Sequence, residues 1–189
     1  MLQPLFNQHD DHFQGNLFSP LELVVYADFQ SHNCGDSYTV VRQLRCKYGD
    51  KLKVVYRHLP LITLHPLALE AAIASEAAAL DGKFWQMHDL IYENQKYLTP
   101  ASFRWFADEI SISLPIRADG LVRSRLQERV MKNFRSGISS GVEGLPGYFI
   151  NRQLYTGFND FKSLCTALDF QMDKMRFYTK SDALFKLRS

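Results

Sequence analysis

A chain of 189 residues, 46% apolar and 22% charged, is long enough to bury one sizeable hydrophobic core, and we expect a single domain over residues 1–189. The formal net charge of +2 is spread without long runs of one sign, which argues against a nucleic-acid partner. The most apolar helical stretch, residues 67–80, contains Glu70 and Glu76, so we expect no membrane span.

The N-terminal segment, MLQPLFNQHDDHFQGN, has neither the basic region nor the apolar region of a signal peptide, so we expect a cytoplasmic protein. Four of its side chains are of types that bind metals: His9, Asp10, Asp11 and His12. Because no other segment offers an obvious completing ligand, we expect a solvated polar tail and no metal site.

The next sixty residues predict a strand, a helix and a strand. Residues 21–29, LELVVYADF, are almost continuously apolar, which is typical of a strand buried on both faces. Helical spacing of apolar residues predicts a helix over about 32–48, and residues 52–58, LKVVYRH, predict a second strand. Such a unit normally places its two strands parallel to each other.

The middle of the chain is helical in pattern. The segments with apolar residues at helical spacing are 65–80, 84–91, the region around 103–106, and 118–137. We therefore expect an all-helical insertion at about 62–140, within a core formed by residues of about 18–61 and 141–175.

Strand character returns at 147–157, GYFINRQLYTG, where Asn151 and Arg152 predict a turn between two short strands. Apolar residues at helical spacing over 161–172 predict a C-terminal helix, and the tail after it predicts one more short helix. The whole order predicts an α/β fold built on a mixed sheet of four main strands.

The junction between the first strand and the first helix reads DFQSHNCG, which contains the motif S-x-x-C. A cysteine at position 31 would give C-H-N-C, a two-cysteine redox motif, but Ser31 leaves one thiol where dithiol exchange needs two. The chain has three cysteines, Cys34, Cys46 and Cys165, an odd and sparse set that does not indicate a disulfide framework.

The element order, the S-x-x-C motif and the segment GLPGYFI resemble the thioredoxin fold, specifically the DsbA-like family of thiol–disulfide oxidoreductases. The resemblance extends over roughly residues 12–170 and includes the stretches DHFQGN, VVYADFQ, VVYRHLPL, HPLALEAA and GKFWQMHDLIYENQ. It implies a thioredoxin-like mixed four-stranded sheet with an inserted all-helical subdomain, and a thiol- or disulfide-containing protein or peptide as partner.

The resemblance also implies roles for individual residues. Ser31 and Cys34 occupy the two cysteine positions of the family motif, His32 and Asn33 the dipeptide that tunes the thiol, and Pro146 the position of a cis-proline. The first cysteine, which attacks the substrate disulfide, is therefore the position at which this chain departs from the family.

Three interpretations of Ser31 follow from its chemistry. A hydroxyl forms no disulfide, so the simplest interpretation is a site that has lost dithiol exchange, with Ser31 acting as the helix N-cap and stabilising the helix by about 1 kcal/mol. Monothiol chemistry through Cys34 is a second interpretation, although burial would raise its pKa and restrict access. A non-catalytic peptide-binding module is the third.

A fourth interpretation rests on another resemblance. Kappa-class glutathione transferases and 2-hydroxychromene-2-carboxylate isomerase have a DsbA-like fold with a serine at this junction, whose hydroxyl donates a hydrogen bond to the sulfur of bound glutathione. In that case Ser31 would hold the glutathione thiolate, and the backbone of Leu145, beside Pro146, would pair with the tripeptide as an added strand.

The remaining polar residues near the motif are assigned supporting roles. Asp28, three residues before Ser31, is expected to be buried or half-buried and to bond the backbone of the next loop, with a proton relay as the alternative. As a cation, His32 would lower the pKa of a neighbouring thiol. We expect His58, His65 and His88, which lie among apolar residues, to be hydrogen-bonded structural histidines.

Overall fold

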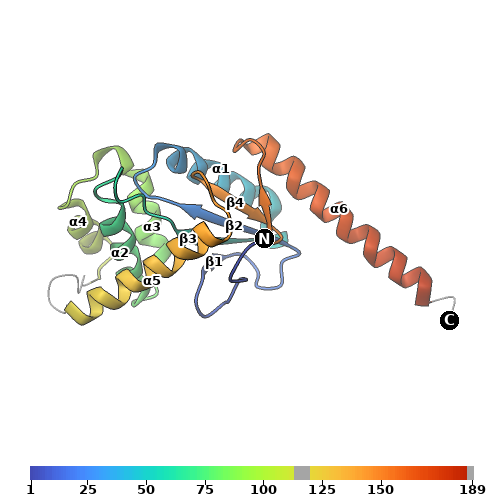
Figure 1. Ribbon diagram of the computed structural model, residues 1–189, viewed down its shortest axis with the longest axis horizontal. Helices are drawn as coiled ribbons and strands as arrows, with labels where there is room; N and C mark the ends of the chain where they lie inside the picture. Colours follow the sequence, from blue (N-terminus) through green and yellow to red (C-terminus); the bar gives the residue numbers. More distant parts are fainter. Residues whose placement is uncertain (113–119, 187–189) are drawn as a thin grey trace.

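The computed structural model describes residues 1–112 and 120–186. A five-stranded sheet in the order β1-β3-β2-β4-β5 runs through the molecule, with helices on both faces (Figure 1). The strands are β1 (His12–Gln14), β2 (Leu21–Ala27), β3 (Leu52–His58), β4 (Gly147–Ile150) and β5 (Gln153–Tyr155). The helices are α1 (His32–Tyr48), α2 (Ala68–Ala79), α3 (Phe84–Glu93), α4 (Ser102–Glu109), α5 (Gly120–Ser139) and α6 (Phe161–Lys186), with two short 3₁₀ turns at Gly49–Lys51 and Gln95–Tyr97.

The two predicted apolar strands form the centre of the sheet. β2 and β3 run parallel in a register that pairs Leu21 with Leu52 and Ala27 with His58. Every residue of β3 is buried, and so is every residue of β2 except Glu22, which is partly exposed. This burial confirms the prediction drawn from their continuous apolar sequence, because strands covered on both faces have no solvent side for polar residues.

The prediction of a solvated N-terminal tail is wrong, because this segment adds a fifth strand to the sheet. β1 pairs antiparallel with β3, with His12 opposite Tyr56. Just before it, Asp11 binds the guanidinium of Arg57 through two contacts of 2.7 and 2.9 Å, and both side chains are at least 95% buried. Since a buried guanidinium requires a carboxylate partner, this ion pair holds the segment against the sheet.

The predicted hairpin is confirmed. β4 and β5 are joined by Asn151 and Arg152, whose φ angles of 45° and 74° are both positive. Two consecutive positive φ values define a type I′ turn, whose twist matches that of the strands it joins. The Asn151 side chain also accepts a hydrogen bond of 2.8 Å from the Glu22 backbone, which fixes the turn against β2.

The two faces of the sheet have separate cores. On one face, Val25 and Tyr56 pack against apolar side chains of α1, α3 and α6. On the other face, Val24 and Tyr26 pack against the N-terminal segment and α5. Gly137 allows α5 to approach closely, because a Cβ there would lie 2.6 Å from a methyl carbon of Leu59.

The described residues between β3 and β4 form helices and the loops that join them, with no strand, and one buried carboxylate ties them to the sheet. Glu76 of α2 accepts contacts from His12 of β1 at 3.1 Å, His58 of β3 at 3.1 Å and Arg129 of α5 at 2.7 Å. Four elements therefore meet at one side chain that is 2% exposed. The boundaries of an inserted subdomain at about 62–140 stay a prediction.

The C-terminal region differs from the prediction of two helices. α6 is one continuous helix of 26 residues, about 39 Å long at the standard rise, and its C-terminal half extends beyond the rest of the molecule (Figure 1). The sequence after Gly157 contains neither glycine nor proline, so nothing in it interrupts the backbone hydrogen bonds.

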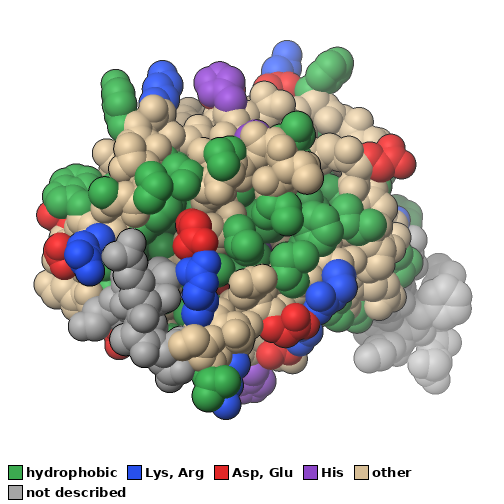
Figure 2. Space-filling view, turned by 60° about the vertical axis from the view of Figure 1, so that its left-hand side comes forward, with side chains coloured by type: hydrophobic (Ala, Val, Ile, Leu, Met, Phe, Trp, Pro, Cys, Tyr) green, Lys and Arg blue, Asp and Glu red, His purple; other side chains and the backbone are tan. Residues whose placement is uncertain are grey.

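The surface carries both signs of charge. The face shown in Figure 2 has apolar side chains gathered at its centre and scattered basic and acidic side chains around them, with no large patch of one sign. No helix in the described parts of the chain has the length and apolar content needed to cross a membrane.

Candidate functional site

The S-x-x-C motif lies where β2 ends and α1 begins. β2 ends at Ala27, a short loop follows, and α1 starts at His32. Gly147 at the start of β4 pairs with Tyr26 near the end of β2, so the residues just before it lie at the same end of the sheet as the motif. These residues are Leu145, which is half-buried, and Pro146, which is buried, and the peptide bond between them is cis.

Ser31 occupies the N-cap position of α1, but its hydroxyl forms no capping hydrogen bond. The prediction of a side-chain cap is therefore wrong, although the helix does begin where the sequence predicts. The Ser31 carbonyl instead accepts the N–H groups of Cys34 at 3.0 Å and Gly35 at 3.1 Å. The hydroxyl consequently contributes little to the helix start, which is held by the backbone.

Cys34 faces inward, as expected for the second position of the motif. It is 1% exposed, and the backbone N–H of Asp28 donates to its sulfur at 3.5 Å. Burial raises the pKa of the Cys34 thiol to about 11, an increase that the Asp28 N–H and the Ser31 hydroxyl partly oppose. At neutral pH the sulfur is therefore a protonated thiol, which is a poor nucleophile.

Neither of the other cysteines supplies a second thiol to the site. Cys46 is exposed on α1, about 18 Å along the helix from Cys34 at the standard rise, and Cys165 is buried on α6. All three cysteines are free, and the structure contains no disulfide within its described residues.

Asp28 has the buried, structural role that was expected, and it also has a histidine partner. Its carboxylate accepts the backbone N–H of Leu61 at 2.8 Å and that of Gln30 at 2.7 Å. It also binds Nδ1 of His65 at 2.7 Å, so this histidine, 26% exposed, belongs to the site. The carboxylate thus ties the motif loop to the loop after β3.

Two glutamines that the sequence did not single out fix the same loop. Gln95 donates to the carbonyl oxygens of Phe29 and Ser31, each at 2.8 Å. Gln30 accepts the backbone N–H of Leu67 at 2.5 Å. These contacts join residues that are 37 to 66 positions apart, so no local pattern could have indicated them.

The dipeptide between Ser31 and Cys34 lies at the surface. His32 and Asn33 are both exposed, and His32 lies 3.9 Å from the carboxylate of Asp36 one turn along the helix. A cation on His32 would therefore be largely solvated and shared with Asp36, which limits its effect on a neighbouring thiol.

The predicted site residues therefore lie together at one end of the sheet, but the nucleophile of dithiol exchange is missing. The helix start, the dipeptide and the loop before Pro146 are present, while the sulfur that remains is buried and protonated. No group of three or more His, Cys, Asp and Glu side chains in the described chain has the geometry of a metal site.

Comparison with known proteins places this chain in a family. Residues 7–170 match a family model described as Thioredoxin. The chain is 35% identical over 158 residues to a Na(+)/H(+) antiporter from Salinispora tropica, a match covering 84% of this chain and 24% of the antiporter. An antiporter from Herminiimonas arsenicoxydans is 31% identical over 169 residues, covering 89% and 27%. The chain thus spans about a quarter of the length of these relatives.

Solved structures show the same fold at low sequence identity. A periplasmic thioredoxin-like protein from Salmonella enterica serovar Typhimurium matches with a TM-score of 0.76 at 20% identity, covering 89% of this chain and 94% of that one. A thiol-disulfide exchange protein from Wolbachia pipientis matches with a TM-score of 0.70 at 20% identity, covering 84% and 86%. The predicted mixed α/β thioredoxin-like fold is confirmed, with five strands in place of four. The chain belongs to the thioredoxin family.

Proposed function

We propose that this chain is a relative of the DsbA-like oxidoreductases whose S-x-x-C site has lost dithiol exchange. Its partner is a thiol- or disulfide-containing protein or peptide, which binds beside Ser31 and Pro146 without completing a redox cycle. The observation that carries this proposal is the state of Cys34, which is 1% exposed, has a pKa of about 11 and has no second cysteine beside it.

The backbone beside Pro146 supports peptide binding. Leu145 is half-buried and its backbone forms no hydrogen bond with any described residue. An unpaired N–H and C=O at the end of a strand can pair with an extended peptide, which then adds a strand to the sheet. Because the hydrogen bonds of such pairing involve only the backbone of the peptide, polypeptides of different sequences can bind in this way.

A glutathione-dependent reaction is the second candidate, and one observation favours it. The Ser31 hydroxyl is not used as a helix cap and instead interacts with the sulfur of Cys34. In the glutathione reaction the hydroxyl would turn to donate a hydrogen bond to a thiolate held at the helix N-terminus. In that reaction, glutathione would supply the sulfur that the chain lacks, and Leu145 would pair with its peptide backbone.

The variant Ser31→Ala separates the two candidates. If the site is a relic, calorimetric titration of the wild type with glutathione shows no saturable binding, and Ser31→Ala lowers the free energy of unfolding by less than about 0.5 kcal/mol, because no cap bond is lost. The matched control is Asp160→Ala. Asp160 precedes α6 and accepts the Ser163 N–H at 2.9 Å, so its loss should cost about 1 kcal/mol. Saturable glutathione binding, with a bound thiol whose pKa rises in Ser31→Ala, would replace our proposal with the second candidate.

A further inference from the structure

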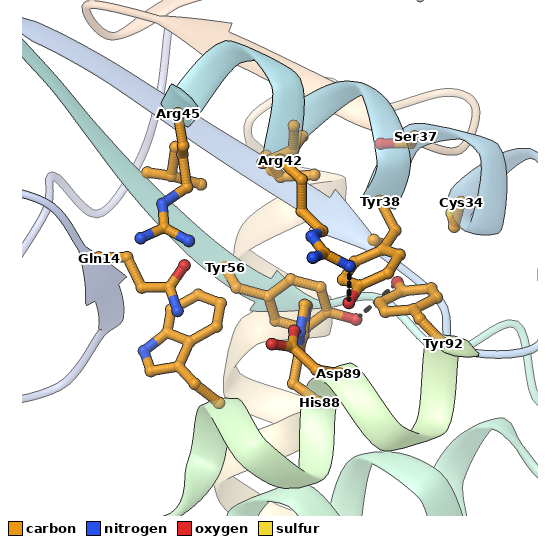
Figure 3. A pocket seen from close by; sticks show the side chains of 15 residues that line it. Gln14, Cys34, Ser37, Tyr38, Arg42, Arg45, Tyr56, His88, Asp89 and Tyr92 are labelled. Carbon is orange, nitrogen blue, oxygen red and sulfur yellow. Dashed lines mark hydrogen bonds and ion pairs between the residues drawn. The ribbon is translucent and has the colours of Figure 1, made fainter. Parts of the chain in front are cut away.

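A cavity of about 60 Å³ lies between α1 and α3, over the face of the sheet that both helices cover. Figure 3 shows α1 above it and α3 below it, with Tyr56 of β3 between them. Val54 and Tyr56 form its floor, and Val41 and Trp85 belong to its walls. The lining of the cavity also includes Cys34, which is buried.

The inner walls of the cavity are aromatic and uncharged. Tyr56 and Tyr92 are fully buried, their hydroxyls lie 3.1 Å apart, and burial raises the pKa of both well above the ordinary value for tyrosine. Burial likewise lowers the pKa of His88, so its imidazole is neutral at neutral pH. A ligand group that enters this part of the cavity is therefore uncharged, and the aromatic rings around it favour a flat one.

Two arginines, Arg42 and Arg45, lie at the mouth of the cavity, and only Arg42 has carboxylates near it. Arg42 lies 3.3 Å from Glu93, and the carboxylate of Asp89 adds a second favourable interaction with it. Asp89 is itself bound to Nδ1 of His88 at 2.8 Å. The negative charges near the mouth are thus already engaged with Arg42 and His88.

The guanidinium of Arg45 forms no ion pair with any described carboxylate. No carboxylate among the described side chains, those of residues 1–112, 120–175 and 177, lies within ion-pair distance of it, although its side chain is only partly exposed. Figure 3 shows its guanidinium directed toward the side-chain amide of Gln14, which forms no hydrogen bond with any described residue. Two polar groups with free donors therefore converge at the mouth of an apolar cavity.

We propose that this cavity binds a small carboxylic acid with a single apolar ring. The ring enters between Tyr56 and Trp85, and the carboxylate binds the guanidinium of Arg45 and the amide of Gln14 at the mouth. The planar fork of a guanidinium matches a carboxylate in two parallel hydrogen bonds, and the aromatic walls favour a flat, apolar body. This site is separate from the peptide-binding role proposed for Ser31 and Pro146, and it does not depend on it.

Benzoate is the probe, and tryptophan fluorescence is the readout. The chain has two tryptophans, and Trp105 on α4 is 56% exposed and is not one of the residues that line the cavity, so Trp105→Phe leaves Trp85 as the single reporter. In this background we expect saturable quenching by benzoate. Benzamide, which has the same ring without the charge, should bind about tenfold more weakly or not measurably.

Three variants test the assignment of residues. Arg45→Gln should weaken benzoate binding about tenfold, because a charge-assisted pair is lost. The matched control Arg104→Gln, an exposed arginine on α4, should leave binding unchanged. Val41→Phe fills the cavity and should abolish binding, while circular dichroism reports whether the variant is folded. Absence of saturable binding to the wild type would overturn the proposal, and so would equal affinities of the wild type and Arg45→Gln.

Discussion

The variant Ser31→Cys is expected to reduce a protein disulfide at least about fiftyfold faster than the wild type at neutral pH. A thiol with the pKa of Cys34, about 11, is ionised in roughly one molecule in ten thousand. A cysteine at a helix N-terminus, with a pKa of about 7.5 or below, is ionised in about a quarter of molecules or more. The lower nucleophilicity of the weaker base offsets part of this ratio, which leaves a factor of about fifty before access is counted. Because Cys34 is 1% exposed, access increases the difference.

Two further variants show whether the gain comes from a restored pair. Ser124→Cys, which places an exposed thiol on α5, should not increase the rate, because none of the three cysteines of the chain lies on that helix to form a pair with it. Ser31→Cys combined with Cys34→Ser should form a mixed disulfide with substrate that is not resolved. If Ser31→Cys were as inactive as Ser124→Cys, the site would not be a relic of an oxidoreductase.

The variant Glu76→Gln is expected to lower the free energy of unfolding by about 3 kcal/mol or more. The carboxylate is 2% exposed and accepts contacts from His12, His58 and Arg129. An amide offers one acceptor oxygen and brings an N–H₂ group against donors, so the guanidinium of Arg129 loses a charged partner at a buried position. Urea unfolding measures the loss, with an unchanged slope against denaturant if only stability is altered.

Glu70→Gln is the matched control on the same helix. Glu70 pairs with Arg123, and the two side chains are 37% and 30% exposed, so its loss should cost no more than about 1 kcal/mol. Equal losses for the two variants would show that the buried cluster is not what joins α2 to the sheet.

The cluster also predicts how stability depends on pH. Burial opposes ionisation of Glu76, but hydrogen bonds from His12 and His58 outweigh it and hold the pKa of this carboxyl well below its ordinary value. The contribution of Glu76 is therefore full above about pH 4.3, the ordinary pKa of glutamate, and declines as the pH falls below that value. Below this pH the wild type should lose stability more steeply than Glu76→Gln.

The parts of the fold that the sequence predicts well are those that depend on local pattern. The ranges of α1 and β3 are confirmed to the residue because their apolar spacing and their end signals agree. β1 was missed because three residues, HFQ, give no alternation to detect. Its position depends on pairing with β3 and on the contact between Asp11 and Arg57, which are 46 residues apart.

The candidate site likewise has some features that the local sequence predicts and others that depend on contacts between distant segments. The inward position of Cys34 was expected from the resemblance to the family motif, whose second cysteine normally lies beneath the first, and the 1% exposure of Cys34 agrees with it. The contacts of Gln95 with the Ser31 loop, and the cavity that places Arg45 near Gln14, exist only after distant segments have packed. The absence of a capping bond from the Ser31 hydroxyl was also unpredictable, because serine at an N-cap position normally forms that bond.

Reduction of insulin by the wild-type protein, with dithiothreitol as the electron source, is the measurement that tests the loss of dithiol exchange most directly. The structure predicts a rate equal to that of dithiothreitol alone, and an identical rate for Cys34→Ser, because the remaining sulfur is buried and protonated. Robust turnover by the wild type that disappears in Cys34→Ser would contradict this account and would assign the chemistry to Cys34.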